Sequence, residues 1–132
     1  MKHVVVVEDD PHNAILFRKL LEKRGGYQVT VTESADELFA LCRGDAALVI
    51  LDVSLAHTHV AGRPVSGVDL CRMLKNDPLT VGVPVVLATA HAMRGDAEKL
   101  IAESGANDYI SKPIIDHNAF LEQIKGMLRE AA

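Results

Sequence analysis

Short apolar runs alternate with amphipathic segments along this chain of 132 residues. The runs are rich in valine, leucine and isoleucine, which is typical of strands, and the amphipathic segments have the apolar spacing of helices. The predicted strands are 3–7, 27–31, 47–51, 83–88 and 108–110, and the predicted helices are 11–24, 34–42, 67–76, 95–104 and 117–130. Five strand–helix units in succession predict an α/β fold in which helices cover both faces of a parallel sheet.

One apolar residue of the first predicted helix does not belong to its buried face. Phe17, Leu20 and Leu21 should pack against the sheet, whereas Ile15 lies on the opposite, charged side. Single exposed aliphatic side chains are common, so Ile15 is either an ordinary surface residue or a contact for a partner.

Composition narrows the classes of function. The formal net charge of -4 argues against a nucleic-acid partner, because phosphate-backbone binding needs clustered lysine and arginine. No apolar stretch approaches the roughly 20 residues that span a membrane, and the run of valines before Glu8 is too short for a signal peptide. Cys42 and Cys71 lie in apolar helical patterns, which fits reduced thiols. We expect one domain over residues 1–132, in the cytoplasm and without membrane contact.

Two predicted strands end at acidic residues. The first is followed by Glu8 and Asp9, and the third by Asp52. The carboxyl ends of parallel strands open on one edge of a sheet, where such folds bind ligands, and carboxylates gathered there repel one another unless a cation intervenes. The sequence therefore predicts a Mg²⁺ site with Asp9 and Asp52 as direct ligands, the Ser54 backbone carbonyl as a third, and Glu8 as a ligand through water.

The ends of the fourth and fifth predicted strands add a hydroxyl and an ammonium group. Thr89 follows the fourth strand, and Lys112 with Pro113 follows the fifth. Together with a metal, these groups suit a phosphoryl group, and a carboxylate can act as the nucleophile that forms an aspartyl phosphate. Asp52 is the best-placed nucleophile. Each feature alone is weak, since acidic residues and proline commonly begin helices, and the signal lies in their joint occurrence.

These residues resemble the receiver domains of two-component response regulators, over essentially the whole chain. The resemblance implies a doubly wound, five-stranded parallel sheet of flavodoxin-like fold, with strand order 2-1-3-4-5. It also implies roles for single positions: an acidic pair at Glu8 and Asp9, the phosphoacceptor at Asp52, the switch hydroxyl at Thr89, the switch aromatic at Tyr109, and Lys112 before a cis Pro113. The opening Val-Glu-Asp-Asp and residues 92–96 look most like the stand-alone, single-domain members.

By the same resemblance, a histidine kinase or histidine phosphotransferase donates the phosphoryl group and the domain itself catalyses the transfer. No other enzyme activity is expected. The modified domain would signal to a downstream protein target through altered contacts, or act as a phosphorelay intermediate. Partner contacts are expected at Ile15, Met93, Lys99 and Pro113.

The segment 54–66 departs from the family pattern. Position 56 is Ala where relatives usually have Pro, the matching glycine is Gly67, and the loop is longer by roughly seven residues. This places partner specificity and phosphoryl lifetime in question. His57 and His59 lie here within reach of one metal ion, but no third ligand stands beside them, so they are better interpreted as solvated loop residues.

Two alternative functions stay open: a Mg²⁺-dependent aspartyl-phosphate phosphatase and an unphosphorylated, receiver-like scaffold. Haloacid-dehalogenase-type phosphatases carry a second Asp two residues after the nucleophile, where this chain has Ser54. The complete set of Asp9, Asp52, Thr89 and Lys112 argues against a scaffold. A flavin carrier of flavodoxin type is remote, because aromatic residues make up only 4% of the chain and no phosphate loop follows the first strand.

Overall fold

The computed structural model describes residues 1–90 and 95–131. Within them, one parallel sheet is built from β1 (His3–Val7), β2 (Gln28–Thr32), β3 (Ala46–Asp52), β6 (Val85–Thr89) and β7 (Asp108–Ser111). The strands lie in the order β2-β1-β3-β6-β7, which is 2-1-3-4-5 when the sheet strands are counted along the chain. This confirms the doubly wound, flavodoxin-like fold.

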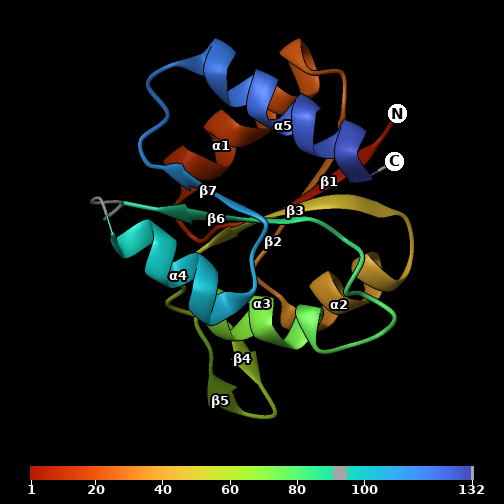
Figure 1. Cartoon of the computed structure of the whole chain (residues 1–132), viewed down its shortest axis with the longest axis vertical. Coiled ribbons are helices and arrows are strands. Elements are labelled where there is room, and N and C mark those ends of the chain that lie inside the picture. The colour runs from red at the N-terminus through yellow and green to blue at the C-terminus, as the bar shows by residue number, and fades with distance from the viewer. Residues whose placement is uncertain (91–94, 132) are drawn as a thin grey trace.

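Helices cover both faces of the sheet (Figure 1). They are α1 (Pro11–Lys19), which continues as a π-helical turn η1 (Leu20–Arg24), then α2 (Ala35–Arg43), α3 (Gly67–Lys75), α4 (Asp96–Ser104) and α5 (His117–Ala131). Helices α1 and α5 pack on one face, and α2, α3 and α4 on the other (Figure 1). Among the residues described, no helix has the length and apolar character needed to cross a membrane.

The central strands are apolar on both sides because both sides are covered. In β1, Val4 and Val6 pack with Phe17 and Phe120 in the core beneath α1 and α5. Their neighbours Val5 and Val7 belong to the core on the opposite face. Alternation along one strand therefore feeds two separate cores, and the residue that follows the last buried valine emerges at the carboxyl edge of the sheet.

Side-chain caps fix where the helices beside that edge begin. Asp10 caps α1 by accepting a hydrogen bond from the His12 N–H at 2.9 Å, and Pro11 takes the first helical position. Helix α3 begins with a complete capping box, in which Ser66 accepts from the Asp69 N–H and Asp69 accepts from the Ser66 N–H. The caps thus set the first residues of α1 and α3, and α1 follows β1 after only three residues.

The sequence suggested that segment 54–66 is an irregular loop, but part of this segment forms regular structure. It contains a two-stranded antiparallel hairpin of β4 (His59–Val60) and β5 (Arg63–Pro64), which lies beyond α3 in Figure 1. Ala61 and Gly62 form its turn with φ of 52° and 79°. Positive φ at both turn residues is the geometry of the tight turns that join strands with the native twist.

Both cysteines are buried and free. Burial raises the pKa of the Cys42 thiol to about 11 and also raises the pKa of Cys71. They act as small apolar residues of the core beneath α2, α3 and α4.

Candidate functional site

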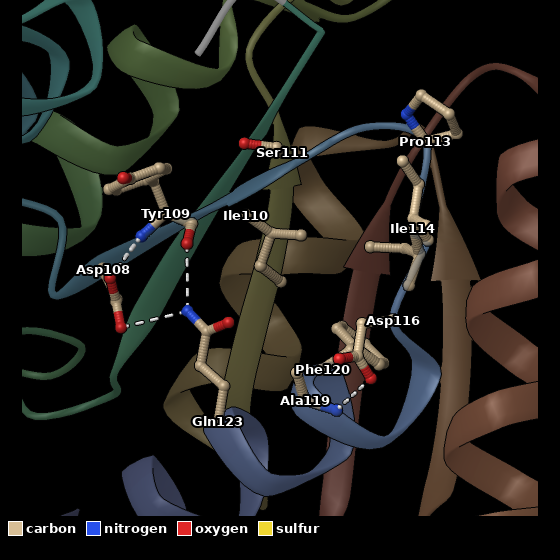
Figure 2. A pocket seen from close by; sticks show the side chains of 11 residues that line it. Asp108, Tyr109, Ile110, Ser111, Pro113, Ile114, Asp116, Ala119, Phe120 and Gln123 are labelled. Atoms are coloured by element: carbon tan, nitrogen blue, oxygen red, sulfur yellow. Dashed lines mark hydrogen bonds between the residues drawn. The ribbon is translucent and has the colours of Figure 1, made fainter. Parts of the chain in front are cut away.

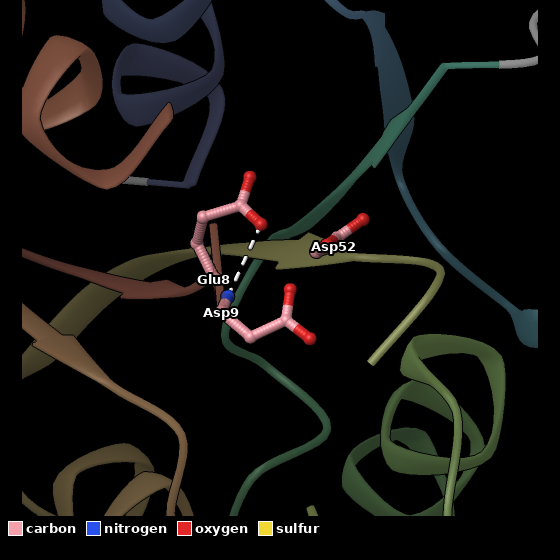
Figure 3. Close-up of side chains that lie close together, drawn as sticks. All are labelled: Glu8, Asp9 and Asp52. Carbon is pink, nitrogen blue, oxygen red and sulfur yellow. Dashed lines mark hydrogen bonds between the residues drawn. The ribbon is translucent and has the colours of Figure 1, made fainter. Parts of the chain in front are cut away.

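Three carboxylates meet at the carboxyl edge of the sheet. Glu8 and Asp9 follow the last residue of β1, and Asp52 ends the neighbouring strand β3. One oxygen from each of the three lies within 4.8 Å of the others, and Figure 3 shows the side chains directed toward one space. Glu8 and Asp52 are buried, so their negative charges are poorly screened by water.

Lys112 places a positive charge in this cluster. It follows β7, and its Nζ lies 3.0 Å from Asp52 Oδ1 and 3.1 Å from Glu8 Oε1. The Lys112 N–H donates to the Thr89 carbonyl at 2.9 Å, and the bond between Lys112 and Pro113 is cis. The ammonium group is therefore brought to the site by strand pairing and by the turn after β7.

The charges in the cluster perturb one another. Burial raises the pKa of Glu8 to about 7, the hydrogen bond to Asp52 adds to this rise, and Lys112 opposes it. Burial disfavours charge on Lys112, but its hydrogen bonds with Asp52 and Glu8 outweigh that effect and raise its pKa. Among residues 1–90 and 95–131, the ammonium group of Lys112 is the one cation paired with these three acidic side chains, and it does not balance them.

The donor set fits a hard divalent cation. It consists of carboxylate oxygens held close together, and within the described part of the chain their negative charge exceeds the positive charge beside them, a surplus that a divalent ion would neutralise. The Ser54 N–H donates to Asp52 Oδ1 at 3.2 Å, so Ser54 lies beside the cluster. Asp9, Asp52 and the backbone carbonyl of Ser54 are the groups that could hold Mg²⁺, with Glu8 behind a water molecule.

Thr89 and Tyr109 lie on the neighbouring strands β6 and β7. Thr89 is buried and follows Ala88, the register partner of Asp52. Tyr109, on β7, is 36% exposed, and its carbonyl accepts a hydrogen bond from Gln123 Nε2 of α5 at 2.9 Å. Tyr109 lines a groove of about 440 Å³ between β7 and α5. Figure 2 shows its lining residues, among them Gln123, which also donates to Asp108.

The expected partner contacts are spread over the surface around the site. Ile15 is 60% exposed on α1, and Pro113 is exposed in the loop after β7. Lys99, on α4, lines a hollow of about 310 Å³ together with Ser54 and Thr89. Met93 lies outside the described residues.

Two contacts near the site were not predicted from the sequence. The Ala56 N–H, from segment 54–66, donates to Asp9 Oδ2 at 2.8 Å. Gly67, at the start of α3, passes so close to Asp52 that a Cβ would lie 2.1 Å from the Asp52 carbonyl oxygen. The matched family glycine was the one signal for the second contact, and no sequence signal pointed to the first.

Comparison with known proteins shows which family this chain resembles in sequence. Residues 4–125 match the response regulator receiver domain family. The polar-differentiation response regulator DivK of Brucella ovis is 38% identical over 131 residues, which are 98% of each chain.

Solved structures give the same result. A CheY-like response regulator receiver domain protein from Methanospirillum hungatei superposes with a TM-score of 0.78 at 25% identity, over 99% of this chain and 96% of that one. The receiver domain of a signal transduction histidine kinase from Syntrophus aciditrophicus gives a TM-score of 0.80 at 27% identity, over 98% and 92%.

Proposed function

Because the chain belongs to the response regulator receiver domain family, we propose that it accepts a phosphoryl group on Asp52 and signals through the contacts of the modified domain. The observation that carries this proposal is the position of Asp52, which ends β3 with Lys112 Nζ 3.0 Å from its Oδ1 and two further carboxylates beside it. Receiver domains exchange phosphoryl groups with histidine kinases or histidine phosphotransferases, so we propose such a protein as the donor.

The transfer would be a displacement at phosphorus. A carboxylate oxygen of Asp52 attacks the phosphorus of a phosphohistidine, the new P–O bond forms, and the P–N bond breaks with its electron pair returning to the imidazole. Lys112 would face the non-bridging oxygens of the transferred group and stabilise their charge. Asp9, Asp52, the Ser54 carbonyl and, through water, Glu8 would hold Mg²⁺, which would supply further charge neutralisation. The chain would thus catalyse only its own phosphorylation and hydrolysis.

The response would pass from Asp52 to the surface through Thr89 and Tyr109. A phosphoryl group on Asp52 adds anionic oxygens beside the hydroxyl of Thr89, which lies one position beyond the register partner of Asp52. Tyr109 lies on the next strand and is partly exposed, so its reorientation would alter the surface at the β7–α5 groove. A downstream protein that prefers one arrangement would be the target, or a further phosphotransferase would take the group in a relay.

The match to DivK supports a single receiver unit over residues 1–132, because 98% of each chain is covered. Buried, free Cys42 and Cys71 support a reducing compartment, for which we propose the cytoplasm.

Asp52→Asn tests the phosphoacceptor. The wild-type protein with Mg²⁺ and acetyl phosphate should gain the mass of one phosphoryl group, and the adduct should be labile to alkali and hydroxylamine. The variant should gain none, because an amide is not a nucleophile for this reaction. Intact-mass spectrometry gives the result, and equal phosphorylation of the variant would refute the assignment of Asp52.

Ile15→Ala tests the docking surface. Since Ile15 is an exposed aliphatic residue on α1, its truncation should slow phosphoryl transfer from a phosphorylated histidine donor about tenfold, by loss of buried area at the interface. The rate with acetyl phosphate should not change, because a small donor needs no docking. Single-turnover kinetics with both donors provide the comparison, and slowing of both rates would show that Ile15 acts on the site itself.

A further inference from the structure

Each carboxylate of the acidic cluster has its own hydrogen-bond donors. Glu8 accepts from Lys112 Nζ and from the N–H groups of the two residues that follow it, and Asp52 accepts from the Ser54 N–H. Asp9 accepts from the Ala56 N–H at 2.8 Å, which is the shortest of these bonds to a backbone donor. The donor for Asp9 thus comes from 47 residues further along the chain, in segment 54–66.

Segment 54–66 is fixed to the body of the domain at several points. At its base, the Val53 N–H donates to the Ala88 carbonyl and the Gly67 N–H donates to the Val53 carbonyl, both at 3.0 Å. Within it, the buried Thr58 hydroxyl donates to the Glu33 carbonyl at 2.8 Å. The Val65 N–H closes the hairpin onto the Thr58 carbonyl at 3.0 Å. Ala56 lies between these anchors, so its N–H is held in place before any ligand arrives.

The bond depends on the residue type at position 56. Proline lacks a backbone N–H and cannot donate, whereas any other residue can. Ala56 itself is exposed, so its methyl group contributes little packing. What this position offers the site is the backbone donor, and this is also the position at which the chain departs from the proline that the family usually carries.

We propose that Ala56 is a positioning residue for cation binding. Its N–H occupies Asp9 Oδ2 and holds the carboxylate so that the side chain stays directed toward Glu8 and Asp52, as Figure 3 shows. The extended segment 54–66 therefore completes the cation site from outside the sheet. This inference rests on the proposed role of Asp9 as a ligand. Donors that hold a ligating carboxylate typically change metal affinity by 10–100-fold when they are removed.

Ala56→Pro removes the donor, and Ala56→Ser is the matched control that keeps it. Mg²⁺ is titrated into each unphosphorylated protein and followed by two-dimensional NMR of the backbone amides. We expect Ala56→Pro to bind Mg²⁺ about tenfold more weakly than the wild type, and Ala56→Ser to bind within about twofold of it. Thermal unfolding in EDTA is measured in parallel, and similar midpoints show that the fold is intact.

A second measurement keeps the test informative if proline disturbs the loop. In the metal-free wild type, the Ala56 amide proton should exchange slowly with solvent and lose this protection in Asp9→Ala. Rapid exchange in both proteins would overturn the inference, as would equal Mg²⁺ affinities of the wild type and Ala56→Pro. A wild-type protein that shows no saturable response to Mg²⁺ would instead contradict the proposed function, so the two failures are distinct.

Discussion

Gly67→Ala is expected to lower the free energy of unfolding by about 3 kcal/mol, among the larger effects of a single methyl group. A Cβ at this position would lie 2.1 Å from the carbonyl oxygen of Asp52 and 2.9 Å from its carbonyl carbon. Both are backbone atoms of the central strand β3, which cannot rotate away as a side chain would. The start of α3 would have to move outward and strain the hydrogen bond from the Gly67 N–H to Val53.

The same displacement should impair the site. The side chain of Asp52 is the proposed nucleophile, and the new methyl group would clash with the backbone carbonyl of this same residue. We therefore expect phosphorylation by acetyl phosphate to be at least tenfold slower in Gly67→Ala, because a small misplacement of a reacting group is costly. Urea denaturation gives the stability, and intact-mass kinetics give the rate.

Gly126→Ala is the matched control. Gly126 lies within α5, and apart from its chain neighbours and the backbone of its own helix no atom of the described residues lies within 4 Å of an added Cβ. Alanine also favours helix over glycine by about 1 kcal/mol. This variant should be slightly more stable than the wild type and phosphorylated at the same rate. Equal stabilities of the two alanine variants would contradict the close approach of α3 to β3.

The sheet could be predicted because its strands are buried on both faces. Val4–Val7 and Leu48–Leu51 are continuous apolar runs, which few other local structures require, and each run stops where the strand leaves the core. The exposed position of Ile15 likewise followed from helical periodicity. The site residues that directly follow such strands were therefore brought together by the fold itself.

The parts of the structure that could not be predicted depend on contacts that leave no periodic pattern of apolar and polar residues in the sequence. Strands of two residues, such as His59–Val60, are too short to show alternation. Their turn requires positive φ at Ala61, and alanine rarely adopts this conformation, so its presence gives no turn signal. The bond from Ala56 to Asp9 uses a backbone N–H that almost every residue possesses. The π-helical turn at Leu20–Arg24 continues α1 without changing which face is apolar, so the pattern indicated a single helix.

Lys112→Met is expected to slow phosphorylation by acetyl phosphate by about 10²-fold or more. Methionine keeps an unbranched apolar chain of similar length and removes only the ammonium group, which lies 3.0 Å from Asp52 Oδ1. Removing one preorganised donor to developing negative charge typically costs 10²–10³ in rate. Lys112→Arg is the control that keeps the positive charge, and it should retain more activity than the methionine variant.

The free energy of unfolding of metal-free Lys112→Met gives an independent measure of what the Lys112 ammonium group contributes. Lys112 is largely buried against Glu8 and Asp52, which are more buried still. Breaking a buried ion pair at one partner usually costs about 3–5 kcal/mol, and we expect the lower end of this range, because Asp52 keeps the Ser54 N–H and Glu8 keeps two backbone donors. Mg²⁺ should recover more stability in Lys112→Met than in the wild type, since it replaces the missing positive charge among three carboxylates. Urea denaturation in EDTA and in saturating Mg²⁺ measures both quantities, and an identical gain in the two proteins would show that Lys112 and the cation do not share the charge of this site.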